Sequence, residues 1–286
     1  MTAVYVLLAL GLALGGVIAL AVKAFAVKTD PRIEQVEELL PGANCGACGF
    51  AGCADFARAL TTGEAAPEEC PVSDPEAASL IANVLGIEAG TRLAKVAVVR
   101  CGGDNESTSK VRYNGVSDCR SANLVAGGAK GCLYGCLGLG SCARACPFGA
   151  IEMREGLALV HSDICTGCGK CVSACPRNLI VLVPREVPIQ VFCNSPEKGA
   201  AKKKVCSVCC IGCRKCVKTA PEGTMTMEGM LARVNHEAPP ENADICEVCP
   251  TGCLRPLDPR DWNEGTPPQT DAAPTSKQPQ EVAANA

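Results

Sequence analysis

The sequence predicts an α+β protein in which one N-terminal transmembrane helix precedes several small cysteine-rich modules. Three observations support this prediction. The first 22 residues carry no charged side chain, the 286-residue chain holds 23 cysteines, and aromatic residues make up only 3% of it. Because so few aromatic side chains cannot fill large cores, the modules must gain stability from cross-links or bound metal.

The segment from Ala3 to Val22 is a run of 20 mainly apolar residues. As a helix it would be about 30 Å long, enough to span a bilayer. A cleaved signal peptide is the alternative, but that would have a basic start and a shorter apolar segment. Lys23, Lys28 and Arg32 follow directly. The positive-inside rule therefore predicts a single-pass protein of the inner (cytoplasmic) membrane, with its N-terminus outside and its cysteine-rich part in the cytoplasm.

Cytoplasmic thiols are kept reduced, so clustered cysteines there indicate metal binding or redox chemistry rather than disulfides. Residues 1–23 are the predicted anchor and residues 24–40 a linker, in which Asp30 and Pro31 predict a helix start. The tail, residues 257–286, is rich in Pro, Thr, Gln and Ala and is predicted to be disordered.

The first cysteine module is expected over residues 41–75. Its four cysteines have the spacing C-x2-C-x4-C-x16-C, and they are Cys45, Cys48, Cys53 and Cys70. Glycines between the first three allow the backbone to pass close to a cofactor. The following residues, "ADFARAL", predict an amphipathic helix.

A mixed connecting domain is expected over residues 76–131. It contains one strand-like run, "AKVAVVRC", and two isolated cysteines, Cys101 and Cys119. Beyond it the sequence repeats itself: residues 146–165 and 220–246 each run from a turn through two short strand-like pieces, placed around a Glu-Gly, to Asp-Ile-Cys. The repeat predicts two related domains, over residues 132–184 and 185–256.

The stretch "CTGCGKCVSACP" in the first of these domains has the spacing of bacterial 4Fe–4S ferredoxins. In two-cluster ferredoxins the cysteine before proline ligates the other cluster. One predicted ligand set is therefore Cys146, Cys165, Cys168 and Cys171. The reciprocal set is Cys132, Cys136, Cys142 and Cys175, in which Leu139 stands where regular spacing would place the middle ligand.

The second domain contains "CIGCRKCVKTAP", in which Ala220 replaces the fourth cysteine. By the same exchange rule, a cysteine at this position would serve a partner cluster whose own triplet is missing downstream. The predicted fourth ligand of this run is the remote cysteine before Pro250. The set is Cys210, Cys213, Cys216 and Cys249.

Zinc bound in cysteine knuckles is the alternative for such runs, but a triple C-x2-C-x2-C ending in x3-C-P is not a zinc-ribbon spacing. No nucleophile with a partner base and no phosphate-binding loop is found, so no catalytic residue is predicted. Electron transfer is the chemistry that the sequence supports.

The ordered set of apolar span, "LPGANCGACGFAGC" with Cys70, "GCLYGCLGLGSCARACPFGAI" and "CTGCGKCVSACP" closely resembles the B subunit of the Rnf complex. This complex is the ion-translocating ferredoxin:NAD oxidoreductase of bacterial membranes, and the resemblance is to the longer, cysteine-rich form. It extends from residue 1 to about residue 256. Taken alone, the first module is also similar to the four-cysteine domain of corrinoid iron-sulfur proteins.

The resemblance implies an electron-transfer subunit that accepts electrons from soluble reduced ferredoxin and relays them through about four 4Fe–4S clusters into a membrane complex that pumps Na⁺ or H⁺. Other subunits would carry the flavins, the NAD site and the ion path. It also implies that the four cysteines of the first module ligate a cluster close to the membrane. The alternative is a tethered electron-transfer protein that feeds another membrane reductase or hydrogenase without ion pumping.

Two features stay open in the sequence. Cys101, Cys119, Cys193 and Cys206 could close a fifth cluster, or each could be a buried free thiol that acts as a small apolar residue. Cys209, Cys246 and Cys253 have no assigned role. The basic residues Lys198 and Lys202 to Lys204 could steer an acidic electron carrier, or they could form a solvated loop.

Overall fold

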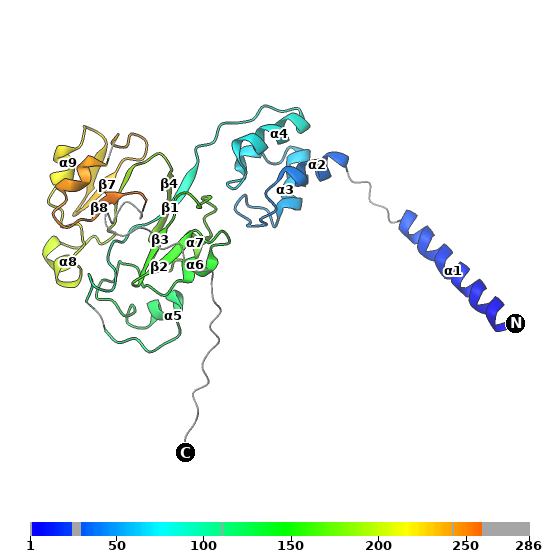
Figure 1. Cartoon of the computed structure of the whole chain (residues 1–286), viewed down its shortest axis with the longest axis horizontal. Coiled ribbons are helices and arrows are strands. Elements are labelled where there is room, and N and C mark those ends of the chain that lie inside the picture. Colours follow the sequence, from blue (N-terminus) through cyan, green and yellow to red (C-terminus); the bar gives the residue numbers. More distant parts are fainter. Residues whose placement is uncertain (1, 25–29, 110, 242, 259–286) are drawn as a thin grey trace, which may run out of the picture. The chain divides into compact units, whose positions relative to one another are not determined.

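The computed structural model describes residues 2–24, 30–109, 111–241 and 243–258, and it divides the chain into two compact units (Figure 1). Unit 1 comprises Met1–Arg92 and unit 2 comprises Leu93–Ala286. Each unit has hydrophobic clusters of its own. Of the tail predicted to be disordered, residues 259–286 lie outside the described residues. Leu257 and Asp258 are described, and they make hydrogen bonds with Pro188 and Ser162. Among the helices described, none meets the combined length and hydropathy criteria for a membrane span.

Unit 1, as far as the structure describes it, contains only helices. They are α1 (Thr2–Ala24), α2 (Pro31–Leu39), α3 (Cys53–Thr62), the 3-10 helix η1 (Pro67–Glu69) and α4 (Pro75–Leu85). The predicted helix start at Asp30 is confirmed, because the Asp30 carboxylate accepts the backbone N–H of Arg32 at 2.9 Å. The predicted amphipathic helix is α3. Its buried Phe56 and Leu60 pack with Val36 of α2 and Ile81 of α4.

The first half of unit 2 follows the order strand, two helices, hairpin, helix, strand. Its elements are β1 (Lys95–Val99), α5 (Cys119–Leu124), α6 (Ser141–Ala145), β2 (Ile151–Arg154), β3 (Leu157–Val160), α7 (Lys170–Ala174) and β4 (Ile180–Pro184). Strand β1 pairs antiparallel with β4, and β2 pairs with β3. Strand β1, which the sequence places in the connecting region, therefore completes the sheet of this half.

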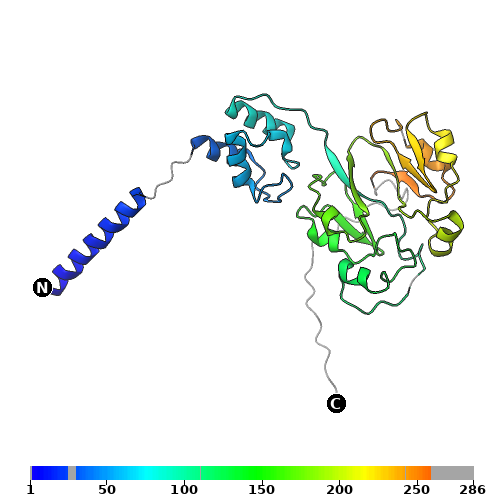
Figure 2. The ribbon, with the colours of Figure 1, turned by 180° about the vertical axis from the view of Figure 1, so that it is seen from behind.

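The second half has the same order of elements. They are β5 (Ile189–Val191), α8 (Gly199–Val205), α9 (Lys215–Thr219), β6 (Met225–Glu228), β7 (Leu231–Val234), the 3-10 helix η2 (Asp244–Val248) and β8 (Leu254–Pro256). Strand β5 pairs with β8 and β6 with β7, again antiparallel. The predicted pairs of short strands in the two repeats are therefore confirmed. Seen from behind, the two halves form separate lobes, one green and one yellow to orange (Figure 2).

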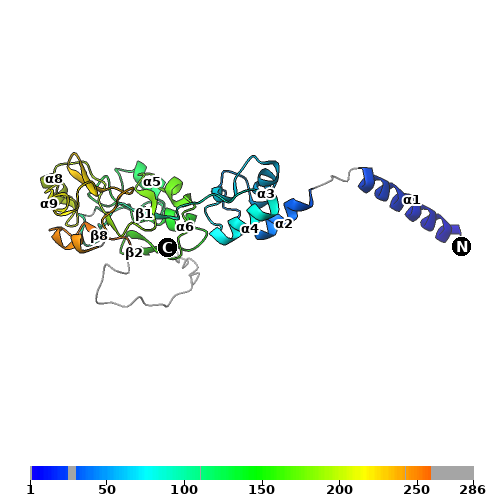
Figure 3. The same cartoon turned by 90° about the horizontal axis from the view of Figure 1, so that it is seen from above.

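Each half of unit 2 has its own apolar cluster, and cysteines are part of both. Val96, Val98 and Val183 form the centre of the first cluster, around the pair β1–β4. Ile189 and Leu231 lie in the second, around β5, β7 and β8. Figure 3 shows α8, α9 and β8 at one end of the unit and α5 and α6 at the other. The cysteine-bearing loops are thus packed into the small cores.

A substitution of Gly138 tests how tightly the turn between β2 and β3 packs against the loop between Cys136 and Cys142. Its φ is +81°, and an added Cβ would collide with the backbone carbonyl of Gly156. Gly138→Ala should therefore lower the free energy of unfolding by about 1 kcal/mol for the left-handed backbone and by roughly 1–3 kcal/mol more for the collision. Gly149→Ala is the matched control, because φ is +66° but no atom lies within 4 Å. Denaturation midpoints of the iron-loaded proteins measure both effects, and equal midpoints would contradict this packing.

Candidate iron-sulfur cluster sites

The four cysteines predicted for the first module line one cavity of unit 1. They are Cys45, Cys48, Cys53 and Cys70. The loop is held by Asn44, whose side-chain oxygen accepts the backbone N–H of Cys53 at 2.8 Å, at the start of α3. Cys70 follows η1 directly, and the carbonyl oxygen of Cys70 accepts a hydrogen bond from the Arg92 guanidinium at 2.5 Å. Segments on both sides of α3 thereby present their thiols to the same space.

A second cavity is lined by the four cysteines of the regular ferredoxin set, Cys146, Cys165, Cys168 and Cys171. The Sγ of Cys165 accepts the backbone N–H of Ala97, at 3.3 Å, from strand β1. Burial raises the pKa of Cys171 to about 12, and the nearby thiols add to this effect. Thiols in such a place ionise only when a cation compensates the charge, as a metal ligand requires.

A third cavity brings together Cys136, Cys142, Cys175 and one cysteine from outside the predicted set, Cys119. Cys132, which the sequence assigned to this group, lies on a different cavity. Burial raises the pKa of Cys142 to about 12, with further repulsion from Cys136, Cys119 and Cys175. Leu139 leaves the middle position of the triplet without a thiol, and Cys119 is the fourth cysteine that lines this cavity.

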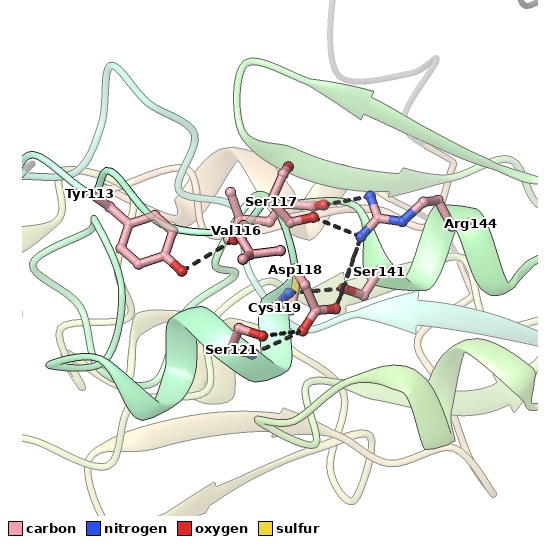
Figure 4. Close-up of polar contacts among 9 residues, drawn as sticks. Tyr113, Val116, Ser117, Asp118, Cys119, Ser121, Ser141 and Arg144 are labelled. Carbon is pink, nitrogen blue, oxygen red and sulfur yellow. Dashed lines mark hydrogen bonds and ion pairs between the residues drawn. The ribbon is translucent and has the colours of Figure 1, made fainter. Parts of the chain in front are cut away.

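A network of hydrogen bonds fixes Cys119 beside α6, the helix that carries Cys142 (Figure 4). The backbone N–H of Cys119 donates to the Ser141 hydroxyl at 2.9 Å, and that hydroxyl donates to the Asp118 carboxylate at 2.8 Å. Asp118 also caps α5 by accepting the Ser121 N–H at 2.9 Å. The hydrogen bonds from Ser121 and Ser141 lower the pKa of Asp118 to about 2. Asp118 therefore stays ionised at neutral pH and keeps Cys119 at the cavity.

A fourth cavity, in the second half of unit 2, is lined by the predicted set Cys210, Cys213, Cys216 and Cys249 together with Cys253. Cys249 and Cys253 place their sulfurs 3.6 Å apart. The hydrogen bond with Cys253 lowers the pKa of Cys249 to about 4, while hydrogen bonds with Cys210 and Cys249 raise the pKa of Cys253. Both cysteines border the cavity beside the triplet, and Cys249 is the one that precedes a proline. Ala220 ends helix α9 and lines no part of this cavity.

A fifth cavity lies between the two halves of unit 2. Its cysteines are Cys101, Cys132, Cys136, Cys193, Cys206 and Cys209. Three of the four cysteines that the sequence grouped for an additional cluster are therefore here, while Cys119 is not. Cys246 is half-buried, and its pKa is raised to about 11 by burial and by Cys249.

The donor sets fit cubane clusters better than single ions. In the part of the chain that the structure describes, no three residues of the types His, Cys, Asp and Glu form a group that could hold one metal ion. A cubane is larger, because its four thiolates bind four different irons. Each of the first four cavities has at least four cysteines around one space, four in three of them and five in the fourth, which matches that requirement.

Comparisons with known proteins agree with the sites. Residues 40–72 match the family described as "Putative Fe-S cluster", and residues 131–179 match the family described as "4Fe-4S dicluster domain". The chain is 40% identical to the B subunit of the Na(+)-translocating ferredoxin:NAD(+) oxidoreductase complex of Acetobacterium woodii, covering 85% of this chain and 74% of the relative. It is 42% identical to the B subunit of the proton-translocating ferredoxin:NAD(+) oxidoreductase complex of Clostridium ljungdahlii, covering 87% and 89%.

A third relative, the B subunit of the ion-translocating oxidoreductase complex of Methanosarcina acetivorans, is 40% identical, covering 86% of this chain and 94% of the relative. The small mixed folds and the cysteine-lined cavities define an iron-sulfur protein of the polyferredoxin class, with multiple 4Fe–4S clusters. The chain belongs to the family of Rnf complex B subunits, which are subunits of ion-translocating oxidoreductases.

The fourth cavity yields a direct test of its remote ligand. Cys249→Ala should remove about four iron atoms per chain, one cubane, because Cys249 precedes Pro250, as Cys146 and Cys175 precede a proline in the first half. Cys253→Ala is the matched control and should keep the full iron content, and Ala220→Cys should add none. Iron and acid-labile sulfide analysis of anaerobically purified chains measures all three. Loss of iron from Cys253→Ala, but not from Cys249→Ala, would reverse the assignment.

Proposed function

We propose that this chain accepts electrons from reduced ferredoxin and relays them within an ion-translocating ferredoxin:NAD oxidoreductase complex. The observation that carries the proposal is the series of cysteine-lined cavities in a chain whose relatives are named as B subunits of such complexes. When bound, 4Fe–4S clusters supply one-electron carriers with potentials that the protein can tune. The chain's own part is to hold, space and bury these carriers.

The proposed ligand sets follow the cavities, so the third set differs from the sequence-based prediction by one residue. The sets are Cys45, Cys48, Cys53 and Cys70; Cys146, Cys165, Cys168 and Cys171; Cys119, Cys136, Cys142 and Cys175; and Cys210, Cys213, Cys216 and Cys249. The proposed domains are a four-cysteine module in unit 1 and two ferredoxin halves in unit 2, over residues 93–184 and 185–256.

We further propose that α1 anchors the chain in the membrane with its N-terminus outside and both cysteine-rich units in the cytoplasm. The support is the composition and exposure of this helix. It has 23 residues, its only charged side chain is Lys23, and large apolar side chains such as Leu7, Leu12 and Leu20 are 70%, 70% and 71% exposed. Without lipid or another protein around them, these side chains would face water.

The topology is testable by protease protection. In spheroplasts, an added protease should leave the cysteine-rich units intact, because the membrane shields them. In inverted membrane vesicles the same protease should remove them. Digestion in intact spheroplasts would contradict the proposed orientation, and release of the uncut chain by a high-salt wash would contradict the anchor.

The basic residues near α8 do not form one exposed patch. Lys202 is 1% exposed, and its ammonium donates to the Met230 carbonyl at 3.0 Å. The idea that all four lysines sit in a solvated loop or steer a partner is therefore wrong for Lys202. Lys198, Lys203 and Lys204 are exposed. We propose these three as the surface that attracts acidic ferredoxin.

Exchanging Lys198, Lys203 and Lys204 for Glu should lower the rate of reduction by ferredoxin at least several-fold at low salt, because the attraction becomes repulsion. At about 1 M salt the variant and the wild type should converge, since screening shortens the reach of the charges. Stopped-flow measurements with reduced ferredoxin check this, and iron content confirms that the variant is loaded. Equal reduction rates for the variant and the wild type at low salt would contradict a role of these three lysines in attracting ferredoxin.

The relay role itself is tested in membranes that contain the whole complex. Cys165→Ser should abolish NAD reduction by reduced ferredoxin, with no change in NADH oxidation by an artificial acceptor, because the NAD site belongs to other subunits. Ion uptake driven by ferredoxin should disappear in parallel. Full ferredoxin-dependent NAD reduction in this variant would contradict the relay role, and electron transfer without any ion uptake by the wild type would point to a non-pumping reductase.

A further inference from the structure

The two halves of unit 2 correspond element by element, and the correspondence extends to cysteines outside the ferredoxin runs. Cys101 lies two residues after the end of β1, and Cys193 lies two residues after the end of β5. Cys132 precedes Cys136 with the spacing C-x3-C, and Cys206 precedes Cys210 with the same spacing. Each half thus contributes one cysteine after its first strand and one before its triplet.

These four equivalent cysteines line one cavity, the fifth described above. A Cβ placed on Gly135 would lie 3.4 Å from the sulfurs of both Cys101 and Cys132. A Cβ placed on Gly103 would lie 3.1 Å from the Cys206 sulfur, and the Cys101 thiol faces the Gly103 carbonyl at 3.9 Å. Cys193 is buried and lines the same cavity. All four cysteines therefore border a common space.

Backbone hydrogen bonds between the halves hold this arrangement. The N–H of Gly102 donates to the Phe192 carbonyl at 2.9 Å, which ties the Cys101 loop to the Cys193 loop. Thr108 forms an antiparallel bridge with Cys206, and the N–H of Ser109 donates to the Val205 carbonyl at 3.2 Å. Within the first half, the N–H of Gly131 donates to the Ser109 carbonyl at 2.5 Å. Segments from four separate parts of the chain thus converge on the cavity.

Two buried lysines make corresponding contacts in the two halves, although Lys130 lies two residues before Cys132 and Lys202 lies four residues before Cys206. The Lys130 ammonium donates to the carbonyls of Gly103 at 3.0 Å and Gly156 at 2.6 Å, and the Lys202 ammonium donates to that of Met230 at 3.0 Å. Gly156 and Met230 are equivalent residues, each directly before the second strand of its hairpin. Lys130 is 5% exposed and Lys202 1% exposed. Both line the cavity.

The buried positive charge of these lysines requires compensation. Among the described residues, no carboxylate lies within ion-pair distance of either ammonium, and none of the described residues lining the cavity is Asp or Glu. The Asp104 carboxylate interacts with Lys130 as an opposite charge but forms no ion pair with it. Burying an ammonium without a counter-charge is costly. A cubane held by four thiolates has a net negative charge and would supply the missing compensation.

We propose that Cys101, Cys132, Cys193 and Cys206 ligate an additional 4Fe–4S cluster between the two ferredoxin halves, with Lys130 and Lys202 as its buried counter-charges. Because it concerns only metal content, the proposal does not depend on ferredoxin as the donor or on ion translocation.

Two other cysteines line this cavity but belong elsewhere. Cys136 also lines the third cavity, and its equivalent, Cys210, lines the fourth cavity with its own triplet and no part of the fifth. Cys209 is equivalent in position to Gly135, so only one half has a thiol there. The symmetric set therefore leaves Cys136 with its triplet and Cys209 as a buried free thiol.

Iron counts of double variants test which cysteines share a cluster. The full wild-type chain, purified without oxygen, should hold about 20 iron atoms, rather than the roughly 16 of four cubanes. Cys132→Ser with Cys193→Ser should lose about four, because both residues serve one cluster. Cys119→Ser with Cys132→Ser should lose about eight, because they serve two. A loss of about eight irons from the first double variant and about four from the second would overturn the proposal. A wild type with about 16 irons would overturn it too.

Cys209→Ser is the matched control and should keep the full iron content; loss of one cubane from it, with none lost from Cys206→Ser, would also overturn the proposed set. If the cysteine variants lose all their iron through unfolding, variants of the lysines provide the test instead. Lys202→Met should shift the reduction potential of one spectroscopic component to a more negative value, since a positive charge that stabilises the reduced state is gone. Lys203→Met, its exposed neighbour, should leave every potential unchanged. No shift with Lys202→Met would contradict the proposal.

Discussion

The structure depends on one constraint, which is that four thiols from more than one segment of the chain must surround one small space. A run of three cysteines can present three sulfurs from a tight loop, but the fourth has to come from a part of the chain that only the fold brings near. Cys146, Cys175 and Cys249 each follow a short helix and precede a proline, so the remote ligand is held by an end of a packed element. Because the cysteines are also part of the small apolar cores, a change at a cluster site is also a change in packing.

The two halves of unit 2 have the same order of elements but provide thiols for different numbers of clusters. In both, a lysine ammonium holds the hairpin turn next to the cysteine loop, and a glycine of positive φ, Gly138 or Gly212, lies against the same turn. The first half has thiols for two clusters of its own. The second has thiols for one, since Ala220 stands where Cys146 stands in the first half and no regular triplet follows it. The space between the halves is shared, with equivalent residues on both sides.

Local features of the fold could be predicted from the sequence. The capped start of α2, the amphipathic helix α3 and the strand pairs around each hairpin turn follow from residue type and spacing within about ten residues. The antiparallel pairing of β1 with β4 spans about 85 residues, and the cysteine spacing gives no sign of it. Pairing over this distance depends on tertiary packing, and it makes residues 93–131 part of the first ferredoxin half.

For the sites, the limit lies with ligands outside the regular runs. Counting cysteines along the chain favoured Cys132 for the triplet with Leu139, because it is the nearest in sequence. Cys119 is farther from the triplet in sequence, but hydrogen bonds that involve Asp118 and Ser141 hold it beside α6. The repeated C-x3-C spacing before both triplets was the available signal that Cys132 corresponds to Cys206. The burial of Lys202 had no signal of its own, since its exposed neighbours have the same side chain.

The most direct test is the position of iron in the full chain, from anomalous scattering of crystals grown without oxygen. We expect five separate iron peaks, three of them at the ferredoxin-type cavities and one at the four-cysteine module. The fifth should lie between the two halves of unit 2, enclosed by Cys101, Cys132, Cys193 and Cys206. Fully occupied peaks at the other four positions with none between the halves, or a peak between the halves whose ligands include Cys119 in place of Cys132, would contradict it.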